Sequence, residues 1–246
     1  QKLLSLLKGR VFDYGFSPSC RVGAAAYHLD REGTRLTVRT PLGDLDLRSR
    51  LVGRHNVYNI LAAVALGISE GLSLPVIRRG IEGVLCVPGR LDKIDSPRGF
   101  SVFVDYAHTD DALKNVLESL RQIPHNGRVI TVFGCGGDRD KGKRPKMGRV
   151  ATDLSDFCFI TSDNPRSEEP RDIIAGIVSG IQKKDFEVIE DRAEAIRRAL
   201  TMAGSGDLVL IAGKGHEAYQ IAKGHTVPFD DKAVAAKILA DMGDHV

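Results

Sequence analysis

The chain lacks the residues and runs that mark several classes of protein. It has no tryptophan and only 4 cysteines in 246 residues, at Cys20, Cys86, Cys135 and Cys158. No two of them form a CxxC pair, so we exclude a disulfide scaffold and a structural zinc site; isolated thiols are typical of the cytoplasm. The longest apolar runs, such as residues 60–68, fall short of the roughly 20 residues that a membrane-spanning helix needs. We also find no signal-peptide pattern, and therefore expect a cytoplasmic protein with no membrane partner.

The balance of charge argues against a nucleic-acid partner. The 35 Lys and Arg residues nearly offset the 32 Asp and Glu residues, which leaves a net charge of +3. Such a charge supplies no strong field for nucleic acid, so we expect no nucleic-acid partner. With 42% hydrophobic residues, the chain can bury the core of one large or two modest domains. Because it starts at Gln1 rather than Met, we expect a piece of a longer protein.

Two patterns of secondary structure divide the chain near residue 88. Short alternating stretches at 23–28, 35–39 and 44–48 predict an antiparallel meander, and two helices should follow between residues 56 and 84. After Pro88-Gly89-Arg90, apolar strands and helices alternate. We therefore expect two domains, 1–87 and 88–246.

The second domain is predicted to be α/β, with a Rossmann-like, mostly parallel sheet. Its strands carry apolar residues on both faces, as parallel strands between helical layers do. The expected strands are 101–104, 129–133, 157–161, 186–189 and 208–212, and the expected helices are 110–123, 146–154, 171–184, 193–203 and 231–242. Residues 226–229 are expected to add an antiparallel edge strand.

Four loops that follow the predicted strands are dense in charge or glycine. Ligands of an open parallel sheet bind outside the carboxyl ends of its strands, where such loops meet. For any single loop, turn-forming glycines and a solvated rim of charge would explain the composition equally well. Four together favour a binding site; the loops are 105–108, 134–140, 162–166 and 213–217.

The loop after the second strand resembles two nucleotide-binding motifs without completing either. Residues 137–144 fit G-x-x-x-x-G-K, but Arg144 stands where a phosphate loop needs Ser or Thr for Mg²⁺. A dinucleotide fingerprint that starts at Gly134 meets Arg139 at its third glycine position. The sequence therefore favours a loop that presents Arg139 to an anion.

The loops after the third and fifth predicted strands carry groups suited to an amino acid. An Arg fork such as Arg166 can hold a carboxylate, while Asp163 can accept an ammonium group, with Asn164 beside them. Glu217 and Arg139 supply a second pair. The set therefore suits a ligand with two ammonium and two carboxylate groups.

A simpler interpretation of the third loop stays open. Asp163 and Asn164 could cap the following helix, while Arg166 pairs with Glu168 or Glu169. His108 and His216 lie on loops without metal-ligand spacing, so we expect them to contact nucleotide or substrate. No Ser-His-Asp order or G-x-S-x-G motif indicates a hydrolase.

Six short motifs follow one another along the chain. They are GRHNVYN (53–59), PGR (88–90), DYAHT (105–109), GGDRDKGKR (136–144), DNPR (163–166) and GKGHE (213–217). In this order they resemble the Mur ligases, and most closely those that add meso-diaminopimelate. The resemblance covers the chain from about residue 20 to its end.

The resemblance implies an ATP-dependent ligase of peptidoglycan precursor synthesis. Such a ligase phosphorylates the D-glutamate side chain of UDP-N-acetylmuramoyl-L-alanyl-D-glutamate, and the amine of meso-diaminopimelate then attacks the acyl phosphate. ATP and Mg²⁺ are the implied cofactors, and a monomer is the implied state. Residues 1–87 would be the end of the central ATP-binding domain and residues 88–246 the amino-acid-binding domain.

The resemblance also implies roles for individual residues. Those that match its ATP site are Asn56, Asn59, Arg90, Asp105, Tyr106 and His108. Those that match its diaminopimelate site are Arg139, Asp163, Asn164, Arg166, Gly213 and Glu217. No catalytic residue and no metal ligand is assigned within this chain.

Two departures from the family pattern accompany the resemblance. Asp110 replaces a proline after the DYAHT motif, a mild change because Asp is favourable at a helix N-terminus. The family's phosphate loop, modified lysine and Mg²⁺ ligands are expected upstream of Gln1, so we expect no turnover by the fragment alone. The alternatives are a binding module without catalysis and a ligase like folylpolyglutamate synthetase.

Overall fold

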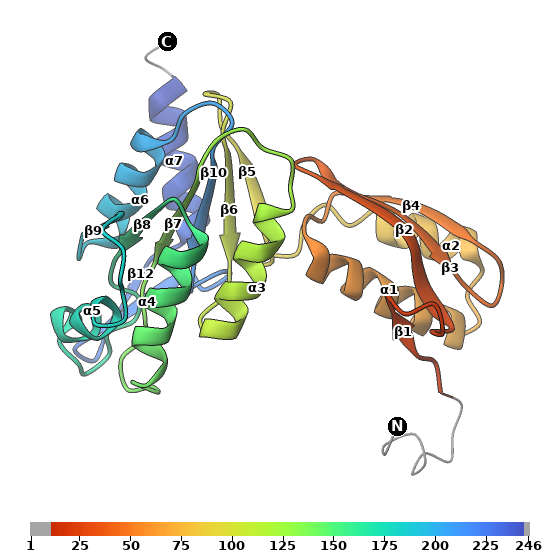
Figure 1. The fold of residues 1–246 in the computed structure, drawn as a ribbon, viewed down its shortest axis with the longest axis horizontal. Coiled ribbons are helices and arrows are strands. Elements are labelled where there is room, and N and C mark those ends of the chain that lie inside the picture. Colours follow the sequence, from red (N-terminus) through yellow and green to blue (C-terminus); the bar gives the residue numbers. More distant parts are fainter. Residues whose placement is uncertain (1–10, 244–246) are drawn as a thin grey trace. The chain divides into compact units, whose positions relative to one another are not determined.

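The chain folds into two compact units, one that ends at Leu85 and one that begins at Cys86 (Figure 1). The computed structural model describes residues 11–243. In this described part, no helix is both long enough and apolar enough to cross a membrane.

The first unit is a four-stranded sheet covered on one face by two helices. Its strand order is β1-β2-β3-β4; β2, β3 and β4 are antiparallel, and β1 pairs in parallel with β2. The meander and both helices are thus confirmed. The elements are β1 (Tyr14–Gly15), β2 (Val22–Asp30), β3 (Gly33–Arg39), β4 (Leu45–Ser49), α1 (Arg54–Ser69) and α2 (Leu74–Glu82).

Alternation along the strands builds the core of this unit. Leu36 and Val38 of β3 point to the same face, as residues two apart in a strand must. They pack with Val57, Leu61 and Val64, which recur at helical spacing on α1. The apolar positions therefore fix which face the helices cover.

The second unit contains a six-stranded sheet in the order β5-β6-β10-β7-β8-β9, in which only β5 is antiparallel. The α/β fold with a mostly parallel sheet is confirmed. The strands are β5 (Asp92–Asp95), β6 (Ser101–Asp105), β7 (Val129–Phe133), β8 (Phe157–Ile160), β9 (Phe186–Val188) and β10 (Leu208–Ala212). The helices are α3 (Asp110–Arg121), α4 (Lys143–Leu154), α5 (Pro170–Val178), α6 (Arg192–Met202) and α7 (Asp231–Gly243).

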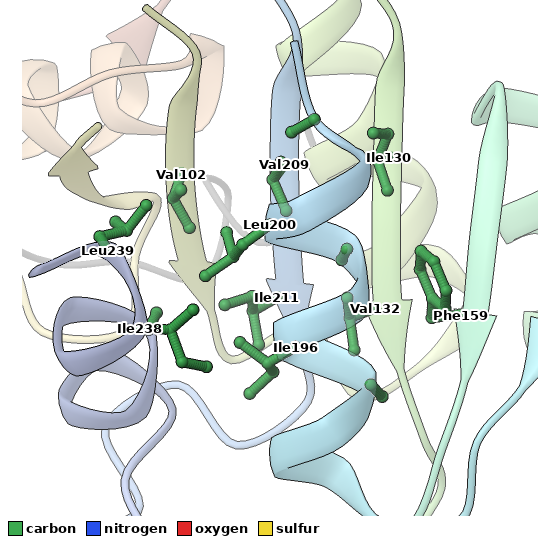
Figure 2. Close-up of a cluster of buried hydrophobic side chains, with 14 of the residues drawn as sticks. Val102, Ile130, Val132, Phe159, Ile196, Leu200, Val209, Ile211, Ile238 and Leu239 are labelled. Atoms are coloured by element: carbon green, nitrogen blue, oxygen red, sulfur yellow. The ribbon is translucent and has the colours of Figure 1, made fainter. Parts of the chain in front are cut away.

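One face of this sheet packs on α6 and α7. Figure 2 shows Ile196 and Leu200 of α6 and Ile238 of α7 directed toward strand residues such as Val209 and Ile211. These side chains are almost wholly removed from water. Burial of each of these side chains contributes roughly 1.5 to 3 kcal/mol of transfer free energy, which stabilises the packing of the two helices on the sheet.

The order of the strands creates a switch point at β10. The chain runs from β6 through β7 and β8 to the edge strand β9, and returns by α6 to insert β10 between β6 and β7. The ends of the strands are in register, with Ala212 opposite both Asp105 and Phe133. The loops after these strands therefore meet at one edge of the sheet, where such folds bind ligands.

The prediction that residues 226–229 form an edge strand of the main sheet is wrong. They fall largely in β12 (His225–Pro228), which pairs with β11 (Tyr219–Ala222) in a separate hairpin. The turn between them has positive φ at Lys223 and Gly224, as the tight turns of two-residue hairpins require. The antiparallel edge strand of the main sheet is β5.

Two helix boundaries differ from the predictions by three residues or more. Helix α4 begins at Lys143 rather than residue 146, because Pro145 is tolerated in the first turn, where its missing N–H has no helical partner. Helix α5 ends at Val178 rather than residue 184. There Gly180 passes so close to Pro145 that a Cβ would lie 1.9 Å from the Pro145 carbonyl oxygen.

Candidate functional site

A cavity of about 460 Å³ opens where the loops after β6, β7, β8 and β10 meet. It lies wholly within the second unit. All the residues predicted for the amino acid line it, namely Arg139, Asp163, Asn164, Arg166, Gly213 and Glu217. Tyr106 and His108 line it as well.

The loop after β7 is locked to the loop after β8. Gly137 donates its N–H to the Asn164 carbonyl (2.9 Å), and a Cβ at Gly137 would lie 1.9 Å from the Pro165 carbonyl oxygen. Only glycine permits that approach. The side chain of Asp138, at φ +54°, accepts hydrogen bonds from the hydroxyl (2.6 Å) and the N–H (3.2 Å) of Ser167. These hydrogen bonds lower the pKa of the Asp138 carboxyl.

The phosphate-loop interpretation of this segment fails on Arg144. Its guanidinium is buried and donates to both carboxylate oxygens of Glu168, at 3.0 and 2.8 Å. Glu168 also accepts the Asp138 N–H at 2.7 Å. Arg144 foremost, together with that N–H, lowers the pKa of Glu168 to about 2. The position that would need a hydroxyl for Mg²⁺ is thus part of a structural ion pair.

The third loop does not cap the next helix, so that simpler interpretation is wrong. Helix α5 follows Glu169, which occupies its N-cap position, and Glu168 pairs with Arg144 instead of Arg166. Arg166 lies at φ +55° and donates from Nη1 to the Gly137 carbonyl at 2.8 Å. Its guanidinium therefore remains at the cavity.

Asn164 is held at three points. Its Oδ1 accepts the Ile221 N–H (3.0 Å) and the Lys214 ammonium (3.0 Å), while its Nδ2 donates to Glu217 Oε2 (2.8 Å). The β11–β12 hairpin also contacts the loop after β8, because Gln220 Nε2 donates a hydrogen bond to the Asp163 carbonyl at 2.6 Å. These bonds fix one side of the cavity, which consists of two acids, Asp163 and Glu217, and the Asn164 amide. We call these three residues the acidic wall.

Two glycines leave space for the polar groups of the cavity. A Cβ at Gly213, which has φ +119°, would lie 3.1 Å from Asp163 Oδ2. A Cβ at Gly136 would lie 2.8 Å from Arg166 Nη1. Both positions therefore keep a charged group within reach of a ligand.

The first loop presents aromatic rings next to a basic side chain. Tyr106 stacks edge-on with His108 (4.6 Å between centroids) and lies 5.2 Å from His216. The exposed guanidinium of Arg90 lies 5.6 Å from the Tyr106 ring. Lys143 donates to the His108 carbonyl at 2.7 Å. This surface offers stacking and positive charge, which suit a nucleotide.

Asp105 lies beneath that surface. Its two oxygens accept the N–H groups of Leu91 and Ala107, each at 2.8 Å. Burial raises the pKa of Asp105 above its usual value, against the opposing effect of these hydrogen bonds and of Arg90. Both carboxylate oxygens of Asp105 therefore accept hydrogen bonds from the protein backbone.

Asn56 and Asn59 belong to the first unit. Asn56 is buried and donates from Nδ2 to the Val52 carbonyl (2.8 Å), and exposed Asn59 donates to Asn56 Oδ1 (3.0 Å). Their predicted role next to a nucleotide stays a prediction.

Several residues at the cavity were not predicted from the sequence. Asp110, Asp140, Lys143 and Tyr219 line the cavity, and Lys214 lies behind its acidic wall. Lys214 stands inside the GKGHE motif, but nothing in the sequence marks a lysine between two glycines as buried. Among the described residues, no three His, Cys, Asp or Glu side chains are grouped as a metal site.

Comparison with known proteins covers both units. The family model described as Mur ligase, glutamate ligase domain matches residues 89–215, and the Mur ligase middle domain matches residues 1–67. Two curated relatives are each named UDP-N-acetylmuramoyl-L-alanyl-D-glutamate--2,6-diaminopimelate ligase. The relative from Geobacter metallireducens is 48% identical over 94% of this chain and 48% of its own length. The relative from Solibacter usitatus is 47% identical over 94% of this chain and 47% of its own length.

A solved structure gives the same relationship. A structure of a ligase of the same name superposes with a TM-score of 0.69 at 34% identity, over 96% of this chain and 49% of the other. The chain therefore spans about half the length of the curated relatives that it matches.

Proposed function

The chain belongs to the Mur ligase family, and from this premise we propose that it is the C-terminal part of a ligase that adds meso-diaminopimelate to UDP-N-acetylmuramoyl-L-alanyl-D-glutamate. The relatives that carry this activity in their names match nearly the whole chain. The proposal includes ATP as the co-substrate, a monomeric enzyme and a cytoplasmic location, which the four free cysteines support.

The proposed reaction has two steps. Transfer of the γ-phosphoryl group of ATP to the D-glutamate side-chain carboxylate gives an acyl phosphate and ADP. A neutral amine of diaminopimelate then attacks the acyl carbon, the bond from that carbon to the phosphate oxygen breaks, and phosphate and a proton are released. The contribution of this chain is alignment of the amino acid, because effective concentration lowers the barrier of the second step.

The single observation that supports the amino-acid site is the union of opposite charges in one cavity. Arg139 and Arg166 are positioned to hold carboxylates, and Asp163 and Glu217 to accept hydrogen bonds from amino groups. We assign the nucleotide side to Arg90, Tyr106 and His108. The described residues present no cluster of metal ligands, so no step is assigned to Mg²⁺ in this chain.

The test is an ATP-dependent ligation assay with the complete ligase, by which we mean the natural gene product that contains this chain. Addition of meso-diaminopimelate and of L-lysine to the nucleotide-linked dipeptide is followed by phosphate release and by mass spectrometry. We expect a clear preference for meso-diaminopimelate. A preference for L-lysine would refute the pocket assignment, and ligand binding without phosphate release would indicate a binding module instead.

A further inference from the structure

A lysine with no exposed surface lies behind the acidic wall of the cavity. Lys214 follows strand β10, and its ammonium group is wholly removed from solvent. Taking an ammonium group out of water is costly unless it is paired and hydrogen-bonded. An apolar side chain of similar length would fill the same space without that cost. The charge of Lys214 therefore has a consequence for its neighbours.

Those neighbours are the three residues of the acidic wall. Lys214 Nζ lies 3.3 Å from Asp163 Oδ1, 3.0 Å from Asn164 Oδ1 and 3.6 Å from Glu217 Oε2. It also lies 5.8 Å from the centroid of the Tyr219 ring. One cation thus contacts every member of the wall from its protein side.

The contacts leave one oxygen of each carboxylate for a ligand. Among the described residues, no hydrogen bond engages Asp163 Oδ2 or Glu217 Oε1, and both residues line the cavity. The wall therefore offers two acceptor oxygens but, with Lys214 included, only one net negative charge. A wall of one net charge suits one ammonium group.

That count matters for the chemistry of the amino acid. The attacking amine must be neutral, because a protonated amine has no lone pair to form the amide bond. A second ammonium group held by an uncompensated carboxylate would keep its proton. A wall with one net negative charge can hold the distant ammonium group and leave the other amine free to react.

We propose that Lys214 is a positioning residue that determines amino-acid specificity: it fixes Asp163, Asn164 and Glu217 and neutralises one of their two charges. Together with Arg139 and Arg166, this wall matches a ligand with two carboxylates and one ammonium group, which is meso-diaminopimelate with its attacking amine neutral. L-lysine in the same state has one carboxylate and one ammonium group, so it leaves one guanidinium unpaired and would fit a more negative wall. This inference rests on the proposed function.

The experiment replaces Lys214 in the complete ligase. Lys214→Met keeps the length of the side chain and removes its charge. We measure kcat and KM for meso-diaminopimelate and for L-lysine at saturating ATP, and KM for ATP at saturating meso-diaminopimelate. We expect the ratio of the two kcat/KM values to fall at least 10-fold toward L-lysine, through KM for meso-diaminopimelate, with KM for ATP unchanged.

A second variant covers the case in which Lys214→Met does not fold. The double variant Lys214→Met/Asp163→Asn removes the carboxylate that would be left unpaired, and a buried pair replaced on both sides is better tolerated than a broken one. Its wall again carries one net charge, from Glu217. We expect it to retain a preference for meso-diaminopimelate, and a preference for L-lysine would overturn the inference.

The matched control is Lys232→Met. Lys232 pairs with both oxygens of Asp92, each at 2.8 Å, outside the cavity. We expect it to leave the ratio unchanged. If Lys214→Met lowers both kcat/KM values equally, or if Lys232→Met shifts the ratio as much, Lys214 acts only in folding and the inference is wrong while the proposed function stands. If the wild-type ligase itself shows no preference for meso-diaminopimelate, the proposed function fails first.

Discussion

Replacing Arg166 with alanine tests the amino-acid site most directly. The guanidinium of Arg166 lines the cavity and donates to described residues from Nη1 alone, to the Gly137 carbonyl at 2.8 Å and to the Asn164 carbonyl at 3.5 Å. Its remaining donors can serve a carboxylate. The loss of a hydrogen bond to a charged group costs about 1.5 to 3 kcal/mol, or roughly a 10- to 150-fold rise in KM. We expect that rise for the amino acid alone.

The backbone of the loop should survive this substitution. The N–H of Arg166 donates to the Ile221 carbonyl (3.0 Å), and its carbonyl accepts the Lys223 N–H (2.7 Å). These bonds hold φ at +55° for any residue at this position, and alanine carries the same strain there as arginine. The effect on KM therefore reports on the side chain.

The assay is steady-state ligation by the complete ligase, with either meso-diaminopimelate or ATP as the varied substrate. Arg171→Ala is the matched control, because Arg171 is exposed on α5 and its pair with Glu190 (3.2 Å) lies on the surface. Arg166→Lys keeps the charge without the planar fork and should recover only part of the affinity. Equal changes in both KM values, or none in that of the amino acid, would refute the assignment of Arg166.

Three further predictions concern the surroundings of the cavity. Gly136→Ala should raise KM for the amino acid several-fold without lowering the melting temperature, because the added Cβ would lie 2.8 Å from the flexible end of Arg166; both are measured on one preparation. Asp231→Ala should lower the free energy of unfolding in urea by about 3 to 5 kcal/mol, because it leaves the buried guanidinium of Arg192, paired at 2.7 Å, without its carboxylate. Glu168→Gln should remove a stabilisation that is complete above about pH 4.5 and is lost as the pH falls toward 2, since the folded-state pKa is about 2 and the unfolded one is higher; acid unfolding of both proteins measures the difference.

Matched variants separate these effects from general disruption. Gly204→Ala adds a Cβ that would meet nothing within 4 Å, so both KM and melting temperature should stay constant. Glu187→Gln breaks an exposed pair with Arg198 (3.5 Å), which should cost less than about 1 kcal/mol. If Glu187→Gln lowered the free energy of unfolding as much as Asp231→Ala does, burial would not explain the large effect of Asp231→Ala.

The sequence predicted the parallel strands well because their burial is visible in the composition. Residues 129–133 and 208–212 are apolar at every position but Thr131, and both strands are buried along their whole length. The edge strand expected at residues 226–229 was predicted poorly. Residues 225–228 are exposed throughout, so no apolar pattern indicates which strand they pair with. Only the turn at Lys223-Gly224 carries that information.

The sequence predicted which loops form the cavity, but not which of their charged side chains face it. The rule that loops meet at the carboxyl ends of parallel strands was enough to bring Arg139, Arg166, Asp163 and Glu217 together. The rule does not tell which charges face a ligand. Lys214 shares its loop with Glu217, yet its ammonium group is buried against the wall while the carboxylate lines the cavity.

Glycines allow the loops around the cavity to approach one another closely. A Cβ at Gly89 would lie 2.8 Å from the backbone nitrogen of His216, and one at Gly215 would lie 2.7 Å from the Tyr106 Cβ. Both residues have positive φ, so each close approach depends on glycine twice over. Gly215 thus brings the loop after β10 against the loop after β6, and Gly137 brings the loop after β7 against the loop after β8. A Cβ at Gly215 should therefore disturb the loops after β6 and β10 together, and a Cβ at Gly137 should disturb the loops after β7 and β8 together.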